Sequence, residues 1–161
     1  MKTIPLSKGY VALVDDEDFE RASRHNWHVE IRKNGPKYAQ TTFTKHRYIT
    51  AMRLHRFIMG CTEGDGAIVD HVNGDGLDNR KANLRRCTQK QNVMNQAKSK
   101  GRYSKYKGVS KCQKGTQWRA YIKFAGKHCE LARGDSEEDM AVYYDVAAQL
   151  FFGEYARLNG V

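Results

Sequence analysis

The apolar pattern of this chain breaks down between residues 61 and 104. Residues 61–95 are rich in Asp, Asn and Gly and show little regular periodicity, and residues 97–104 resemble a polar, basic linker. A chain of 161 residues can form one compact domain or two small ones. The break favours two, at residues 1–96 and 105–161, joined by the linker 97–104.

The first sixty residues predict a small α+β segment. Residues 10–14 are apolar and rich in β-branched side chains, which favours a strand. The acidic run at 15–18 then suits the first turn of a helix, where negative charge meets the positive end of the helix dipole. Further elements are expected as strands at 27–31, 38–43 and 48–52, and as a helix at 54–59 that ends at Gly60.

Residues 105–161 predict a three-stranded antiparallel sheet packed on one helix. The strands are expected at 106–110, 118–123 and 127–131, with turns between them. Ser136 is a suitable N-cap for the helix, which has apolar positions on one face and ends at Gly153. The fold class expected for the whole chain is therefore α+β.

The charge distribution points to a polyanionic partner. Lys and Arg number 28 against 18 acids, a formal net charge of +10. Residues 101–135 hold nine basic and two acidic side chains, and residues 136–161 hold one basic and five acidic ones, so one face is expected to be basic. No apolar run reaches the ~20 residues that span a bilayer, and residues 1–14 do not resemble a signal peptide. We therefore expect a cytoplasmic, non-secreted protein whose partner is nucleic acid rather than a membrane.

The four cysteines disfavour a zinc site, because Cys61, Cys87, Cys112 and Cys129 are scattered and form no closely spaced pair. They are interpreted as reduced thiols of a reducing compartment.

The stretch around Asp70 and His71 has the residue types that phosphodiester hydrolysis needs. A histidine can take a proton from water near neutral pH. A neighbouring carboxylate, with an asparagine oxygen, can hold a hard divalent cation. An asparagine oxygen can also fix the tautomer of the histidine. An isolated Asp-His pair in a loop is equally compatible with a solvated turn, and Asn and Gly are common in loops.

Residues 54–95 closely resemble phage-type HNH homing endonucleases. The matching segments run from Leu-His-Arg-Phe through Asp-His-Val-Asn-Gly-Asp to Asn-Leu-Arg-Arg-Cys-Thr-Gln-Lys-Gln-Asn-Val-Met-Asn. The resemblance implies a ββα-metal fold, in which two short strands and a helix surround one cation. The match covers about 40 residues in the family's order and spacing.

The resemblance also implies a role for each matched residue. Asp70 corresponds to a metal ligand, His71 to the general base, and Asn83 to the central asparagine that supports the loop and the histidine. Asn92 stands where the family has its second metal ligand. His55 corresponds to a recurrent upstream histidine of the catalytic region. Asparagine at the final position favours Mg²⁺ or Mn²⁺ over zinc.

Residues 104–160 resemble an APETALA/ethylene-response-factor DNA-binding domain. The resemblance is carried by Tyr-Lys-Gly-Val, Trp-Arg-Ala-Tyr-Ile, the helical Ala-Val-Tyr-Tyr-Asp-Val-Ala-Ala and Phe-Gly-Glu-Tyr-Ala-Arg-Leu-Asn. It implies a sheet that enters the major groove. Ser110 and Cys112 stand where that family has basic residues, which weakens base-specific readout more than phosphate binding. Trp118 is as compatible with a core position as with DNA contact. The DNA-binding residues implied are Lys107, Lys111, Trp118, Arg119, Tyr121 and Lys123.

The sequence thus predicts a site-preferring, Mg²⁺- or Mn²⁺-dependent endonuclease that acts on duplex DNA. With one centre per chain, a monomer would nick one strand, and cutting both strands would need a homodimer or two successive events. Two alternatives stay open: a non-catalytic, sequence-specific DNA-binding regulator, and a nuclease for structured RNA. The resemblance implies a phage-like origin.

Overall fold

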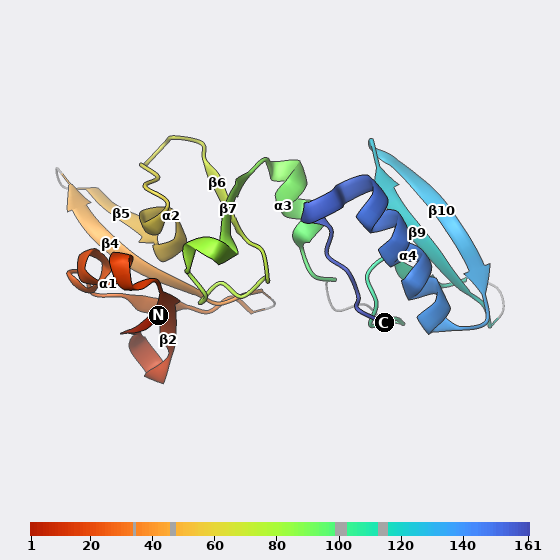
Figure 1. The fold of residues 1–161 in the computed structure, drawn as a ribbon, viewed down its shortest axis with the longest axis horizontal. Helices are drawn as coiled ribbons and strands as arrows, with labels where there is room; N and C mark the ends of the chain where they lie inside the picture. The colour runs from red at the N-terminus through yellow and green to blue at the C-terminus, as the bar shows by residue number, and fades with distance from the viewer. Residues whose placement is uncertain (34, 46–47, 99–102, 113–115) are drawn as a thin grey trace. The chain divides into compact units, whose positions relative to one another are not determined.

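The computed structural model describes residues 1–33, 35–45, 48–98, 103–112 and 116–161. They divide into two compact units, Met1–Gln89 and Lys90–Val161 (Figure 1). Together they contain small antiparallel sheets and a few helices, which confirms the predicted mixture of strands and helices. Of the linker predicted at 97–104, residues 99–102 lie outside the described residues.

The first unit surrounds one apolar core. Strand β1 (Lys2–Pro5) pairs antiparallel with β2 (Val11–Val14), and helix α1 (Asp16–Ser23) follows with three acids in its first turn. A second sheet has the order β3-β4-β5, and helix α2 (Leu54–Ile58) continues directly from it. Its strands are β3 (His28–Glu30), β4 (Tyr38–Lys45) and β5 (Tyr48–Arg53). The centre of the core is formed by Ile4, Ala12, Val14, Ala22, Trp27, Val29, Ala39, Leu54, Ile58, Val69 and Leu84.

A two-stranded ribbon lies within the stretch that had no apolar periodicity. Strand β6 (Ile68–His71) pairs antiparallel with β7 (Leu84–Cys87) within residues 61–95, which have little regular periodicity. The strands are only four residues long, and their inward side chains Val69 and Leu84 join the core. Pairing and burial stabilise these strands more than any local pattern, which is why the residue pattern did not reveal them.

The loop between β6 and β7 is held against β2. The Leu13 amide donates to the Leu77 carbonyl oxygen, and the Asn79 amide donates to the Leu13 carbonyl oxygen, each at 2.8 Å. These two bonds form a short parallel bridge at Leu13 and Asp78. A turn of 3-10 helix (Lys81–Asn83) then leads into β7. The loop therefore has a defined position although it has little secondary structure.

The second unit contains a three-stranded sheet covered by one helix. The strand order is β10-β9-β8, with β8 at Val109–Lys111, β9 at Trp118–Phe124 and β10 at Lys127–Gly134. Helix α4 (Glu137–Phe152) packs on the sheet, as Figure 1 shows, and its Ser136 Oγ accepts a hydrogen bond from the Asp139 amide at 3.0 Å, which confirms the predicted cap. The core residues are Val109, Ala120, Ile122, Met140, Ala141, Tyr144, Ala147 and Ala148.

The short helix α3 (Gln89–Asn95) begins at the boundary between the units. Two lysines connect residues 94–98, at and after the end of α3, to residues 106–109 of the second unit. Lys107 Nζ donates to the carbonyl oxygens of Met94 and Gln96 at 2.5 and 2.7 Å. Lys98 Nζ donates to the carbonyl oxygen of Tyr106, before β8, at 2.7 Å and to that of Val109, the first residue of β8, at 3.0 Å. The helices among the described residues are too short or too polar to cross a membrane.

Candidate active site around Asp70 and His71

The last two residues of β6 supply the two central side chains of the predicted site. Asp70 and His71 are 8% and 5% exposed, so both are buried in the first unit. In the antiparallel register Asp70 faces Arg85 of β7, and His71 faces Leu84. Because His71 ends the strand, its side chain meets the loop that follows, whereas Asp70 stays within the ribbon.

Asn79 holds the His71 ring in a defined chemical form. His71 Nε2 lies 3.4 Å from Asn79 Oδ1, and Asn79 is fully buried. The Asn79 amide nitrogen Nδ2 donates to the Leu77 carbonyl oxygen at 3.0 Å, which turns Oδ1 toward the imidazole. An amide oxygen only accepts, so this contact favours the tautomer that carries its proton on Nε2.

Burial lowers the pKa of His71 below its ordinary value. Desolvation disfavours the imidazolium and outweighs the opposing effects of the Asn79 hydrogen bond and of the carboxylates of Asp70, Asp75 and Asp78. The ring is therefore predominantly neutral near pH 7. A neutral imidazole is the form that can accept a proton from water.

Two further rings surround His71. The His55 ring from α2 is 4.7 Å away, edge to face, and the Tyr38 ring from β4 is 5.8 Å from His71 and 5.5 Å from His55. Burial, and secondarily the neighbouring His71, lower the pKa of His55 to about 3. Its Nδ1 atom is buried without a hydrogen-bond partner among the described residues. His55 thus lies at the predicted centre as a neutral ring in contact with the proposed base.

Asn83 supports the loop rather than touching the histidine. Its Oδ1 accepts from the Asn73 amide at 2.9 Å, and its Nδ2 donates to Asn73 Oδ1 at 3.0 Å and to the Asp78 carbonyl oxygen at 2.8 Å. The Asp78 carboxylate in turn receives two bonds from Arg80, at 2.7 and 2.6 Å. Asn79 contacts His71 directly.

Gly76 lets the same loop approach the start of β4. A Cβ atom added at Gly76 would lie 2.2 Å from the Lys37 carbonyl oxygen and 2.6 Å from the nearest atom of the Tyr38 ring. Tyr38 is also the aromatic neighbour of both histidines. The loop, Tyr38 and the histidine pair therefore form one close-packed group.

Asp70 is the carboxylate donor of the predicted centre. Among the described residues, no group of three or more His, Cys, Asp or Glu side chains is placed to hold a metal ion. Asp70 offers carboxylate oxygen, and an amide oxygen such as that of Asn92 would add a second hard donor, with water completing the shell. Asn92 belongs to the second unit, in α3, so its pairing with Asp70 stays a prediction.

The predicted DNA-binding residues of the second unit fall into separate groups. Strand alternation along β9 turns Ala120 and Ile122 toward α4 and places Arg119, Tyr121 and Lys123 on the opposite face of the sheet. Trp118 lies two residues before Ala120, so its side chain is on the same face of the strand as Ala120 and Ile122, and it packs against the core. Lys111, its partner in the register, is exposed with Nζ 5.8 Å from the Trp118 ring. Lys107 is half-buried on the carbonyl oxygens near the end of α3, and burial lowers its pKa to about 8.

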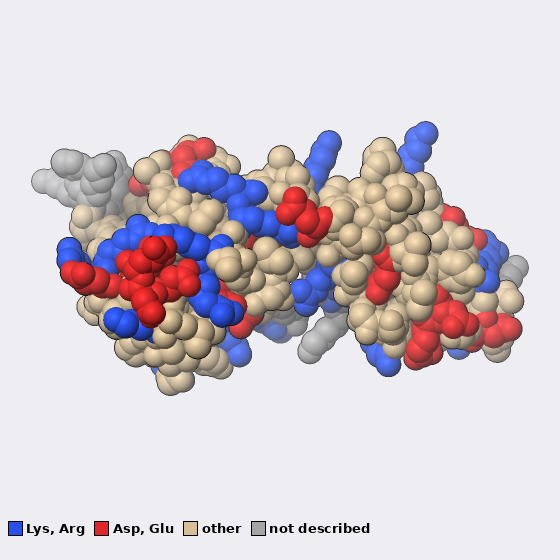
Figure 2. All heavy atoms as spheres, viewed as in Figure 1, with Lys and Arg blue, Asp and Glu red and all other residues tan. Residues whose placement is uncertain are grey.

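The outer sheet face holds further residues that the sequence did not single out. Arg119 Cζ lies 5.9 Å from the Tyr121 ring, and the His128 ring of β10 lies 6.2 Å from the same ring. Arg133 is paired there with Glu130. Register with β9 places these β10 residues beside Arg119, Tyr121 and Lys123. Figure 2 shows acidic side chains gathered near the start of α4, which covers the other face.

A neutral buried histidine beside a carboxylate is a combination that can activate water for hydrolysis. Comparison with known proteins agrees with this class. The profile of the HNH endonuclease family matches residues 53–94, which include Asp70, His71, Asn83, Asn92 and His55.

Two viral proteins are similar over most of the chain. An uncharacterised HNH endonuclease of Acanthamoeba polyphaga mimivirus is 29% identical over 154 residues, covering 96% of this chain and 77% of that protein. Protein 3.8 of Escherichia phage T7 is 30% identical over 116 residues, covering 70% of this chain and 95% of that protein. No solved structure matches. The chain therefore contains an HNH endonuclease family domain at residues 53–94, and it is a nuclease.

Proposed function

We propose that this nuclease hydrolyses phosphodiester bonds in duplex DNA with the help of Mg²⁺ or Mn²⁺, at a preferred site, in the manner of phage-type homing endonucleases. The observation that carries the proposal is the state of His71: buried, neutral, with Nε2 directed to Asn79 and with Asp70 next to it in the chain. Both relatives come from viruses, which supports a viral setting.

Each residue has one task in the proposed reaction. His71 Nδ1 takes a proton from the attacking water. Asp70 and Asn92 would hold the divalent cation, which, when bound, polarises the phosphate and stabilises the leaving oxygen. Asn83 maintains the loop through Asn73 and Asp78. In chain order, β6, β7 and α3 correspond to the two strands and the helix of the ββα-metal fold.

His55 would act through His71. Its ring packs edge to face on the proposed base, and its low pKa keeps it uncharged at neutral pH. An uncharged neighbour adds no repulsion when His71 acquires a proton during the reaction.

We also propose that residues 105–161 form a DNA-binding module whose outer sheet face meets the duplex. Arg119, Tyr121 and Lys123 lie together on this face, and the major groove is wide enough for a β-ribbon. Lys107 and Trp118 would contribute indirectly, through the packing described above. The acids of α4 lie on the opposite layer, so phosphate attraction favours the sheet face.

Cleavage of supercoiled plasmid tests the proposal. Purified protein is incubated with the plasmid and Mg²⁺, beside a His71→Ala variant and an EDTA control. We expect Mg²⁺-dependent relaxation or linearisation that the variant loses by at least ~100-fold, since general-base catalysis typically contributes that much. The ratio of nicked to linear product distinguishes a monomeric nicking enzyme from a homodimer that cuts both strands.

A His71→Gln variant serves as a second control, because glutamine fills the site without a basic nitrogen. Undiminished cleavage by both variants would contradict the assignment of His71. Degradation of structured RNA in preference to duplex DNA would contradict the assignment of the substrate.

A further inference from the structure

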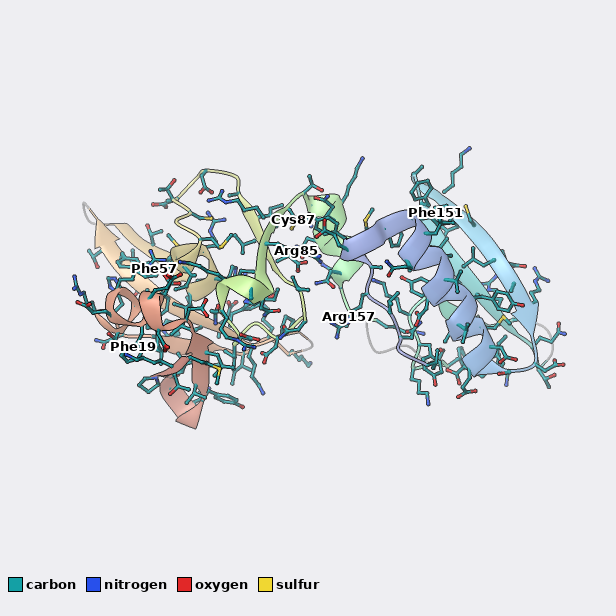
Figure 3. The ribbon with its side chains drawn as sticks, in the orientation of Figure 1. Phe19, Phe57, Arg85, Cys87, Phe151 and Arg157 are labelled. Carbon is teal, nitrogen blue, oxygen red and sulfur yellow. The ribbon has the colours of Figure 1, made fainter. Side chains whose placement is uncertain are left out.

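The proposed metal ligand Asp70 already has a positively charged partner in β7. Arg85 Nε and Nη2 both donate to Asp70 Oδ2, at 3.2 and 3.0 Å, and the antiparallel register places the two residues directly opposite one another. Both side chains are largely buried. Figure 3 labels Arg85 on β7, where its side chain can be followed.

A purely structural explanation of this ion pair is weak. Burying two charges costs desolvation energy that their attraction often fails to offset, so a buried pair is poor evidence for stability. The neighbouring Arg86 has its charged side chain exposed to solvent, as is usual for arginine, and it donates to the Met59 carbonyl oxygen. Arg85 instead brings a permanent positive charge to a carboxylate at the proposed centre.

That charge must affect any cation that binds Asp70. The two bonds that Arg85 Nε and Nη2 donate to Asp70 fall on Oδ2, so Arg85 orients this carboxylate. A divalent cation on the same carboxylate would be repelled by the guanidinium. Repulsion between charges of +2 and +1 at a separation of ~6 Å corresponds to about a tenfold loss of affinity even at the dielectric constant of water, and to more in a buried site.

We propose that Arg85 is a charge-setting and positioning residue that makes cation binding at Asp70 depend on DNA. The charges of Asp70 and Arg85 cancel one another, so a cation bound to Asp70 adds an excess charge of +2 to this pair. A DNA phosphate beside the site compensates this charge, and both positive groups then attract the scissile phosphate. The inference rests on the proposed function, because it takes Asp70 as a metal ligand.

Titration with Mn²⁺ alone, followed by electron paramagnetic resonance at low salt, tests the proposal on the full chain. The Arg85→Gln variant keeps a donor for Asp70 but removes the charge, and we expect it to bind Mn²⁺ at least ~10-fold more tightly than the wild type. The same variant is expected to cleave plasmid at least ~10-fold more slowly, since it has lost a positive group at the phosphate.

Two variants serve as controls. Arg85→Lys keeps the charge and should bind Mn²⁺ within about threefold of the wild type. Arg86→Gln removes an equal charge from the next position of the strand, away from Asp70, and should change Mn²⁺ affinity by less than about twofold. A residue that only orients the carboxylate would give the opposite sign, with weaker Mn²⁺ binding and slower cleavage in Arg85→Gln. That result, or unchanged Mn²⁺ affinity, overturns the proposal.

Circular dichroism establishes that each variant is folded. If Arg85→Gln does not fold, a His71→Ala protein that retains Arg85 is titrated with Mn²⁺ with and without a 20-base-pair duplex. Tightening by at least ~10-fold on adding the duplex is expected, and its absence overturns the proposal. An Asp70→Asn variant distinguishes failure of the proposed function from failure of the inference about Arg85. If Asp70→Asn leaves Mn²⁺ affinity unchanged, Asp70 is not the metal ligand, whatever the Arg85 variants show.

Discussion

Replacing Gly76 by alanine is expected to displace the loop that holds His71. The added Cβ would lie 2.2 Å from the Lys37 carbonyl oxygen, which is backbone, and 2.6 and 2.7 Å from two atoms of the Tyr38 ring. Ordinary contacts need more than 3 Å, so the loop or β4 must move by about 1 Å. Overpacking of this kind costs about 1–3 kcal/mol. A displacement near 1 Å beside reacting groups can also slow catalysis by up to ~100-fold.

Urea unfolding monitored by tryptophan fluorescence measures the first of these effects. Trp27 reports on the core of the first unit, and a Trp118→Phe background removes the signal of the second unit. A loss of about 2 kcal/mol would lower the urea midpoint by roughly 1 M at a slope of about 2 kcal/mol/M. Gly35→Ala is the matched control, because its Cβ would meet only Arg32 side-chain atoms at 3.5 Å or more. Equal midpoints for Gly76→Ala and Gly35→Ala would refute the reasoning.

Two other expectations concern pH and salt. The pKa of His55 is lowered to about 3 by burial, so below pH 6.5 the unfolded chain takes up a proton that the folded chain does not. The free energy of unfolding should therefore fall as pH drops from 6.5 to 5, by up to about 1.4 kcal/mol per pH unit, and His55→Phe should remove this part. Urea unfolding at pH 7, 6 and 5 measures this pH dependence, and an identical dependence in His55→Phe contradicts the assignment to His55. The salt expectation concerns Lys123: Lys123→Gln should weaken DNA binding and reduce the slope of log affinity against log salt by about 1. Fluorescence anisotropy measures that slope, and Lys8→Gln in the first unit is the charge-matched control, so equal slopes for both variants would count against the sheet face.

Much of the secondary structure is decided by short-range physics and could be predicted from the sequence. The apolar residues before the acidic run form β2, and α2 ends at Ile58, two residues before Gly60, which has a φ of +65° that glycine adopts readily. Ser136 caps α4 as expected, because an N-cap depends only on the next three residues. Residue type alone made Asp70 and His71 candidates, and the resemblance to HNH endonucleases supplied their roles.

Longer-range pairing decided what the sequence pattern missed. Strands β6 and β7 exist because two four-residue segments pair and bury Val69 and Leu84, and neither segment has a periodicity of its own. Their register alone makes Arg85 the partner of Asp70.

The second unit shows the same limit for individual side chains. The resemblance to the APETALA/ethylene-response-factor domain implied DNA contact for Lys107, and folding turns its Nζ toward two carbonyl oxygens near the end of α3. Likewise the alternation of side chains along β9 places Trp118 on the side of the sheet that faces the core.

By itself, the sequence determined the kinds of chemical group present and the local elements that carry them, because these depend on residue type and near neighbours. Only the tertiary structure decided which groups meet. Asn79 contacts His71 and Arg85 pairs with Asp70 because β2, the loop and the β6–β7 ribbon are brought together by contacts between residues far apart in the chain. Such contacts depend on burial and register, which no local pattern encodes.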